Sequence, residues 1–164
     1  MALGAGVVGP MLALEIVDTW LDTPFSGAYA GQYALPMAAD DFSYLTNDTL
    51  ASCRVYDYEA EAWKTLYDLD AAAGDDPYAF FLSGSRALLT VENPNASTDK
   101  ELILFRDSYG SAIAPLLAEG YAKITLIDIR YLAPELLPRF VDFTGKDVLF
   151  LYSTTVLNSS NTLR

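Results

Sequence analysis

The chain has 164 residues, 52% of them hydrophobic, which is enough apolar chain for one folded domain and excludes a disordered tail. Its net charge is −12 with only 10 Lys and Arg residues, which argues against a nucleic-acid-binding protein because phosphate binding needs clustered cations. The absence of histidine and the single cysteine exclude a Ser-His-Asp triad or a zinc site built from this chain alone, and also an internal disulfide.

The first 24 residues form an apolar N-terminal segment. Residues 1–16 of it have the hydropathy of a signal peptide, but the first basic residue of the chain is Arg54, so the basic region that a signal peptide needs is missing. Glycines and Pro10 interrupt residues 1–16, which are also too few to cross a bilayer. We therefore expect no signal peptide in this chain, and a buried or poorly ordered start to a single domain over 1–164.

Residues 25–100 form an irregular, β-rich part. Tyr, Phe and Val between turn residues predict short strands, at 29–35, 53–58, 78–82 and 86–91. The run "WKTLYDLD" at 63–70 fits either a strand or a helical turn. Gly74 and Pro77 predict a turn over 71–77, and the polar stretch 92–100 predicts a loop.

Residues 101–164 are regular. Apolar runs predict strands at 102–105, 123–130 and 147–153, and helical patterns lie between them at 109–119, with Pro115 as a kink, and at 134–143. Strand, helix, strand, helix, strand at this spacing predicts an α/β fold with a flavodoxin-like parallel sheet. Ligands of such sheets bind beyond the carboxyl ends of the strands.

Three loops converge at that edge, and Ser108 lies in the first of them. A hydroxyl at a strand-to-helix turn faces the free N–H groups of the helix, which suits a nucleophile next to an oxyanion site. Ser and Asp are also the usual N-cap residues, and spacing alone favours the cap for Ser108 and Asp107.

Charged residues at the strand ends have two interpretations. Arg106, Asp128 and Arg130 either bind an anionic substrate or pair with one another as structure. No paired carboxylates follow the first strand and no glycine-rich phosphate loop follows any strand, so we expect no metal and no cofactor. The topology alone also allows a receiver- or flavodoxin-like binding domain, which would bind Mg²⁺ or flavin.

Two blocks carry a resemblance to a known family. "PYAFFLSGSRALLTVENP" followed by "KELILFRDSYGSAIAPLLAEGYAKITLIDIRYL" resembles the C-terminal part of the bacterial DHHW-motif family, whose members are SGNH-hydrolase-like and related to alginate O-acetyltransferase-type proteins. The similarity runs from about residue 25 to 158 and is strongest at 101–131, where "RDSYG" is followed by "IDIRY". It implies a partial SGNH-like sheet, an extracytoplasmic or cell-envelope location and acyl-ester chemistry on a polysaccharide.

The resemblance also implies site residues. The family's "DS" block places its nucleophile at Ser108. The strand at 147–153 resembles the strand that ends in an oxyanion-hole Asn, but Ser153 and Thr154 stand there and Asn158 comes four residues after Thr154. In "FLSGS", Ser85 stands where the family often has Asn. The oxyanion or substrate-edge candidates are Asp107, Tyr109, Gly110, Arg130, Tyr131, Ser153, Thr154, Asn158, Gly84 and Ser85.

One departure from the family decides the expected activity. The family's Asp-His-His-Trp motif lies upstream of these blocks, and this chain has no histidine. The chain thus resembles the C-terminal half of a longer protein that is truncated, split or degenerate. It is either the serine-bearing half of an esterase or O-acetyltransferase, inactive alone, or a non-catalytic envelope or glycan-binding protein. A His-bearing upstream segment, or a homodimer across an open sheet edge, would be its partner.

Overall fold

The computed structural model describes residues 17–25, 38–74 and 76–159. The apolar residues 1–16 and the strand expected at 29–35 lie outside the described residues. The elements in chain order are β1 (Val17–Phe25), β2 (Asp40–Thr46), α3 (Asp48–Ser52), β3 (Arg54–Asp57), β4 (Ala62–Thr65), α4 (Leu69–Ala72), η1 (Pro77–Phe80), β5 (Leu88–Glu92), β6 (Glu101–Arg106), α5 (Tyr109–Leu117), η2 (Ala118–Gly120), β7 (Lys123–Ile127), η3 (Pro134–Arg139), β8 (Asp147–Leu151) and α6 (Thr154–Asn158).

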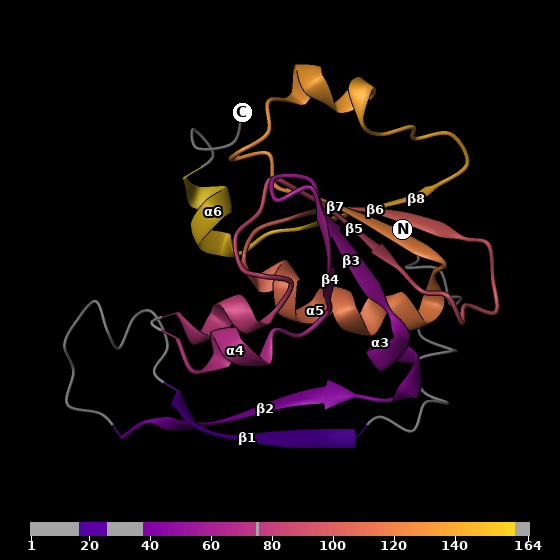
Figure 1. The fold of residues 1–164 in the computed structure, drawn as a ribbon. Helices are drawn as coiled ribbons and strands as arrows, with labels where there is room; N and C mark the ends of the chain where they lie inside the picture. Colours follow the sequence, from indigo (N-terminus) through magenta and orange to yellow (C-terminus); the bar gives the residue numbers. More distant parts are fainter. Residues whose placement is uncertain (1–16, 26–37, 75, 160–164) are drawn as a thin grey trace.

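A six-stranded mixed sheet organises the described part of the chain, in the order β4-β3-β5-β7-β6-β8 (Figure 1). Strands β7, β6 and β8 are parallel, as the βαβαβ pattern predicts, and β6 lies between the other two. Strands β5, β3 and β4 continue the sheet in antiparallel pairs, so the α/β class is confirmed but the sheet is not purely parallel.

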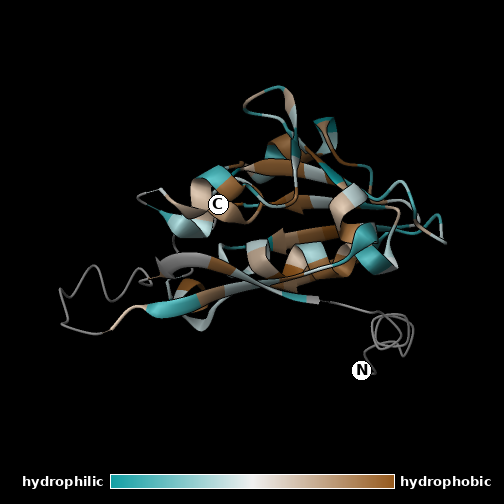
Figure 2. Cartoon of the chain, turned by 60° about the horizontal axis from the view of Figure 1, so that its bottom comes forward, coloured by the Kyte–Doolittle hydropathy of each residue, from teal (hydrophilic) through white to brown (hydrophobic). Residues whose placement is uncertain are grey.

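Apolar clusters lie on both faces of this sheet, and the strongly hydrophobic residues gather in its central strands (Figure 2). On one face, α5 and η2 pack Ala114, Leu117 and Ala118 against Leu104 and Leu126. On the other face, Leu137 and Val141 of the β7–β8 connection share a buried cluster with Phe105 and Ile127. Because β6 is buried on both faces, it reads in the sequence as a continuous apolar run.

A two-stranded antiparallel sheet of β1 and β2 forms a separate layer below α4 in Figure 1. It packs through Phe42 onto Phe80, with the rings 5.3 Å apart, and Tyr44 contacts Phe80 as well. The pair was not predicted, and it places residues 17–24 of the expected apolar segment in a strand. Packing against this sheet explains why the segment 77–81 is rich in aromatic residues.

The strand expected at 78–82 is wrong. Pro77 opens the 3-10 helix η1, and the Asp76 carboxylate accepts a hydrogen bond from the Tyr78 N–H at its start. Proline at the first helical position with an aspartate before it is a helix-start signal. Only Phe81 keeps a single β-bridge, to Tyr67. The aromatic residues here serve burial in a helical turn and not strand pairing.

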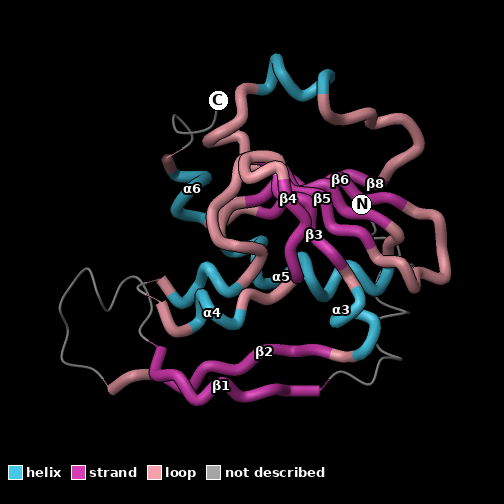
Figure 3. Tube along the Cα trace, viewed as in Figure 1, coloured by secondary structure: helices cyan, strands magenta, loops and turns pink. Residues whose placement is uncertain are grey.

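The helix expected at 134–143 is also shorter than predicted. The structure has the 3-10 helix η3 there, and loop follows it to β8 (Figure 3). Pro138 lies inside η3 and has no N–H to donate, which prevents a regular α-helix at this point. The "WKTLYDLD" alternative resolves into both of its readings, because β4 ends at Thr65 and α4 begins at Leu69.

Candidate functional site

The turn from β6 into α5 carries Ser108. Its backbone is already helical, with φ −59° and ψ −31°, and its side chain makes no capping hydrogen bond. The Asp107 carboxylate caps instead, through a 3.0 Å hydrogen bond from the Tyr109 N–H to Oδ1. The expectation that the Ser108 hydroxyl caps the helix is therefore wrong, although the half-buried Ser108 occupies the N-cap position of α5.

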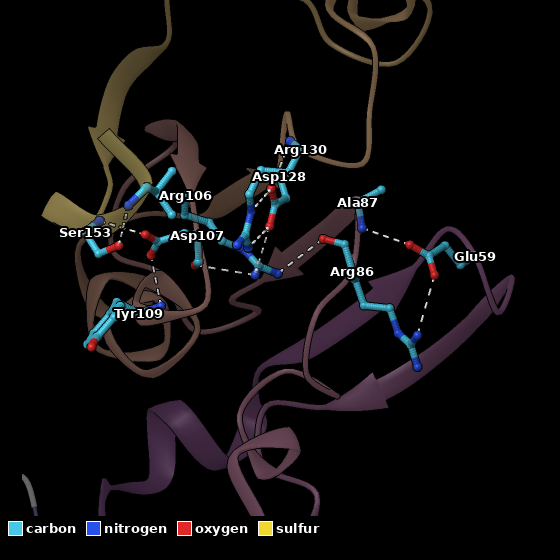
Figure 4. A network of polar contacts seen from close by, with 10 residues as sticks. Glu59, Arg86, Ala87, Arg106, Asp107, Tyr109, Asp128, Arg130 and Ser153 are labelled. Atoms are coloured by element: carbon cyan, nitrogen blue, oxygen red, sulfur yellow. Dashed lines mark hydrogen bonds and ion pairs between the residues drawn. The ribbon is translucent and has the colours of Figure 1, made fainter. Parts of the chain in front are cut away.

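Asp107 also ties two loops of the sheet edge together. Its Oδ2 accepts a 2.6 Å hydrogen bond from the Ser153 N–H, at the end of β8, and the side chain is 1% exposed (Figure 4). A carboxylate that accepts backbone N–H groups on both oxygens is held in one orientation. Asp107 thus connects the Ser108 turn to the loop after β8, as expected of residues at adjacent carboxyl ends.

The loop after β8 contributes less than the sequence suggested. The Ser153 hydroxyl accepts a hydrogen bond from the Val156 N–H at 3.3 Å and so caps α6. Thr154 is exposed in the first turn of α6, and Asn158 is exposed at its last residue. Among the described residues no hydrogen bond joins Asn158 to Asp107, Ser108 or Ser153.

A buried charge cluster lies beside this turn, where β6 and β7 end. Asp128 is fully buried and forms two hydrogen bonds with the Arg130 guanidinium, of 2.9 and 2.6 Å, and a third with the Arg130 N–H at 3.1 Å. Arg106 is also fully buried, but its nearest contact with Asp128 is 3.9 Å. The paired-structure interpretation of these charges therefore accounts for Asp128 and Arg130.

The guanidinium of Arg106 forms weaker hydrogen bonds than that of Arg130 does. Its guanidinium donates to the Asp107 carbonyl at 3.5 Å and to the Arg86 carbonyl at 3.4 Å (Figure 4), and its Nε has no hydrogen-bond partner among the described residues. Burial lowers the pKa of Arg106, with Asp128 opposing that effect, whereas the hydrogen bond to Asp128 raises the pKa of Arg130. Arg106 is thus a buried cation held by long contacts.

The "FLSGS" turn reaches the same cluster through the Arg86 carbonyl. Three consecutive residues in it are left-handed, Leu82 at φ 54°, Ser83 at 59° and Gly84 at 79°. A left-handed leucine or serine is strained and persists only where the surrounding structure holds it. Gly84 relieves the strain at its position, and Ser85 is exposed beyond it.

Gly110 has a packing role that the sequence did not reveal. A Cβ at this position would lie 2.5 Å from the Arg106 Cβ and 3.1 Å from its Cγ. The first turn of α5 therefore lies directly against the buried Arg106 stem, and only glycine allows this approach. Its N–H donates to the Asp107 carbonyl at 3.1 Å, so it is not a free oxyanion donor in this structure.

Aromatic side chains frame the site. Tyr109 and Tyr131 are both more than half exposed, and the Arg130 guanidinium lies 5.3 Å from the Tyr131 ring centre. Tyr152, which follows β8, was not predicted: its hydroxyl is buried without a hydrogen-bond partner among the described residues. Burial, followed by the nearby Asp128, raises the pKa of Tyr152 to about 12. Only its position after the third parallel strand could have indicated it.

The described residues contain no group of three or more His, Cys, Asp or Glu side chains suited to a metal ion. Within the same residues, none of the helices combines the length and the apolar character that crossing a membrane would need.

No protein-family model matches the chain. Among solved structures, the chain is similar to a DHHW family protein from Eubacterium siraeum, with a TM-score of 0.66 and 22% identity over 90% of this chain and 50% of that one. It is also similar to Bacillus cereus PatB1, with a TM-score of 0.64 and 22% identity over 90% of this chain and 51% of PatB1. A PatB1 structure with a sulfonyl adduct matches with a TM-score of 0.63 and 20% identity, over 87% of this chain and 48% of that one.

These similarities confirm the fold that the DHHW resemblance implies. The chain spans about half the length of the solved structures that it matches. A separate match of 27 residues, 59% identical to ribose-5-P isomerase B of Listeria innocua, covers 16% of this chain and 18% of that protein. A match of that size carries no argument about activity.

Proposed function

We propose that this chain is the serine-bearing half of an SGNH-like acyl-ester hydrolase or O-acetyltransferase, with Ser108 as the nucleophile. The observation that carries the proposal is the Ser108 hydroxyl, which stands at a strand-to-helix turn and takes no part in capping it. The adjacent Asp107 carboxylate caps α5, which is the structural role that a serine at this position often has. Ser108 is thus available for chemistry at the edge where parallel sheets bind ligands.

The similarity to a DHHW family protein and to PatB1 supports acyl transfer as the reaction class, because the family resemblance implies acyl-ester chemistry on this fold. One of the PatB1 structures carries a sulfonyl adduct. Sulfonyl groups form adducts with activated nucleophiles, and the serine hydroxyl is one of these. In such a reaction the Ser108 oxygen would attack the ester carbonyl, the acyl group would pass to the serine, and the alcohol would leave with a proton.

Removal of the Ser108 hydroxyl proton is the step for which we expect the chain alone to lack a catalyst. A serine hydroxyl needs a general base, and the chain has no histidine. Asp107 is the nearest carboxylate in sequence, and both of its oxygens already accept backbone N–H groups. Loss of one member of a catalytic triad costs several orders of magnitude in rate. A His-bearing segment would have to supply the base.

For the substrate we propose a cell-envelope polysaccharide, and for the protein a location outside the cytoplasm. Tyr109, the first residue of α5 after β6, is 56% exposed, and Tyr131, in the loop after β7, is 55% exposed. An exposed tyrosine offers an apolar ring face and a polar hydroxyl, which suits a sugar ring. The same pair supports the second candidate function, a non-catalytic glycan-binding protein that retains the fold.

The test begins with the coding DNA upstream of the Met1 codon. If an Asp-His-His-Trp segment is encoded there, its co-expression with this chain should produce turnover of an activated acetyl ester, and Ser108→Ala should abolish it. Ser97→Ala, at an exposed position of the loop between β5 and β6, is the matched control. Turnover by the chain alone, abolished by Ser108→Ala, would contradict the proposed inactivity. Glycan binding that survives Ser108→Ala, without turnover in any mixture, would favour the second function.

A further inference from the structure

Strand β8 is an open edge of the sheet. It pairs with β6 on one side, and nothing in the described ranges pairs with its other side. Every second residue of an edge strand directs its N–H and C=O away from the sheet. The exposed face of β8 is apolar: Phe150 is 64% exposed and Val148 is 45% exposed.

Within the described residues, this edge has little of the usual protection against pairing. Edges are commonly blocked by lysine, proline or a bulge. Strand β8 contains one charged residue, Asp147, and its register with β6 runs from Asp147 to Leu151 without a shift. The other edge strand, β4, has Lys64 in it. Strand β8 is thus the edge of the sheet that is open to another strand.

Three stacked phenylalanine rings adjoin the open edge. The Phe150 ring stacks on the buried Phe105 ring, with centres 4.6 Å apart and planes 6° apart, and Phe143 stacks on Phe105 at 6.3 Å. Phe143 is itself 41% exposed. Exposed apolar side chains that are already held in place lose little entropy when a partner covers them.

We propose that β8 pairs with β8 of a second copy of this chain, antiparallel about a two-fold axis at Leu149. In this register Val148 of each copy lies opposite Phe150 of the other copy on the exposed face, so the two-fold axis creates two such pairs. Pairs of an aromatic with a β-branched residue are favourable across strands. Leu149 lies opposite itself on the other face, so the five-residue strand is complementary to its own copy.

Charge is compatible with this contact despite the net charge of −12 on each chain. The charged residues at the strand are Lys146 and Asp147, and Lys146 is paired with Glu101 at 2.7 Å. In the proposed register Asp147 faces Leu151 and Lys146 faces Tyr152, so no like charges lie opposite each other. Depletion of charge at the centre of a contact is typical of interfaces.

The proposed dimer also affects the sheet edge that holds Ser108. Antiparallel pairing brings the start of β8 from the second copy beside Leu151 and Tyr152, which precede Ser153. The two copies would form one continuous sheet with a Ser108 turn toward each end. The inference concerns assembly and does not rest on the proposed activity.

The first test is sedimentation velocity on the whole chain. We expect the mass of two chains for the native protein and of one chain for Phe150→Lys, a twofold fall. Trp63→Lys on the other edge strand, where Trp63 is 47% exposed, is the matched control and should stay dimeric. Circular dichroism checks that each variant is folded. A native chain that sediments as a monomer overturns the proposal and leaves β8 to a different polypeptide.

The second test reads the register by cysteine cross-linking. Residues directly opposite each other have Cα atoms about 4.5–5.5 Å apart, within the range for a disulfide. Under mild oxidation Leu149→Cys should form a covalent dimer, whereas Val148→Cys should not, because position 148 faces 150. The native Cys53 is buried and its pKa is raised to about 12 by burial, so it gives no background. Cross-linking at 148 but not at 149 overturns the register.

Discussion

The N–H of Ser153 lies 2.6 Å from Asp107 Oδ2, although the two residues are 46 positions apart in the sequence. This hydrogen bond joins the carboxyl ends of β6 and β8, and the other oxygen of the same carboxylate accepts from the Tyr109 N–H at 3.0 Å. Asp107 therefore sets the position of the Ser108 turn relative to the β8 loop.

Asp107→Ala should destabilise the fold by about 2–6 kcal/mol, since it leaves two backbone donors without their acceptor, and each loss costs about 1–3 kcal/mol. The change in the free energy of unfolding is measured with urea. Asp107→Asn keeps one acceptor oxygen and should cost less. Equal costs for the two variants would show that the carboxylate does not hold both loops.

Gly110→Ala should destabilise the fold by about 1–3 kcal/mol, because its Cβ would lie 2.5 Å from the Arg106 Cβ and overpack the contact. The control is Gly120→Ala, where a Cβ meets nothing within 4 Å. That change should be neutral or stabilise by up to about 1 kcal/mol, through the unfolded chain. Thermal unfolding of both variants separates packing from helix propensity.

Asp128→Asn should cost about 3–5 kcal/mol, because it leaves the buried cations without their counter-ion. Arg106→Met should cost less, since Arg130 still forms its two hydrogen bonds with Asp128 and the Met side chain still packs on Gly110. Urea unfolding of the two variants gives the comparison. A larger loss for Arg106→Met would mean that Arg106, and not Arg130, is the main partner of Asp128.

The acid limb of stability should depend on Asp57. Burial alone would raise the pKa of Asp57, but hydrogen bonds from Lys64 and from the N–H groups of Ala60 and Glu59 lower it below its ordinary value of 3.8. The folded state therefore binds this proton more weakly than the unfolded state does. Its contribution should be complete above pH about 4 and disappear as the pH falls through the lower folded pKa.

Unfolding free energies measured between pH 2 and 7 test this dependence. Asp57→Asn should weaken the fall of stability in acid, whereas Asp99→Asn, at an exposed position between β5 and β6, should leave it as in the native chain. An unchanged acid limb in Asp57→Asn would place the acid sensitivity at other carboxylates.

Tyr152→Phe should leave stability unchanged or raise it slightly, because the hydroxyl is buried without a partner among the described residues. Tyr121→Phe is the matched comparison: its hydroxyl donates to Asp147 at 3.0 Å, and its loss should cost about 1 kcal/mol. Chemical unfolding of the two variants provides the measurement. A marked loss in Tyr152→Phe would reveal a partner for that hydroxyl.

Much of the parallel half could be predicted because its signals are local. The run 102–105 is apolar on both faces of β6, and α5 and β7 begin where the sequence pattern predicts, at Tyr109 and Lys123. The aromatic run at 78–82 misled because burial of Phe80 against Phe42 produces the same composition as a strand. Composition records that a residue is buried and not which backbone conformation buries it.

The sequence determined the class of the fold, the parallel strands and the absence of an imidazole, since hydrophobic period and residue identity are properties of the chain alone. Only the folded structure decided that Asp107 and not Ser108 caps α5, that Gly110 makes room for Arg106, and that β8 is left at an open edge. Each of these depends on which distant segments meet. Distances between residues such as Asp107 and Ser153 are set by packing of the whole sheet, which no local pattern encodes.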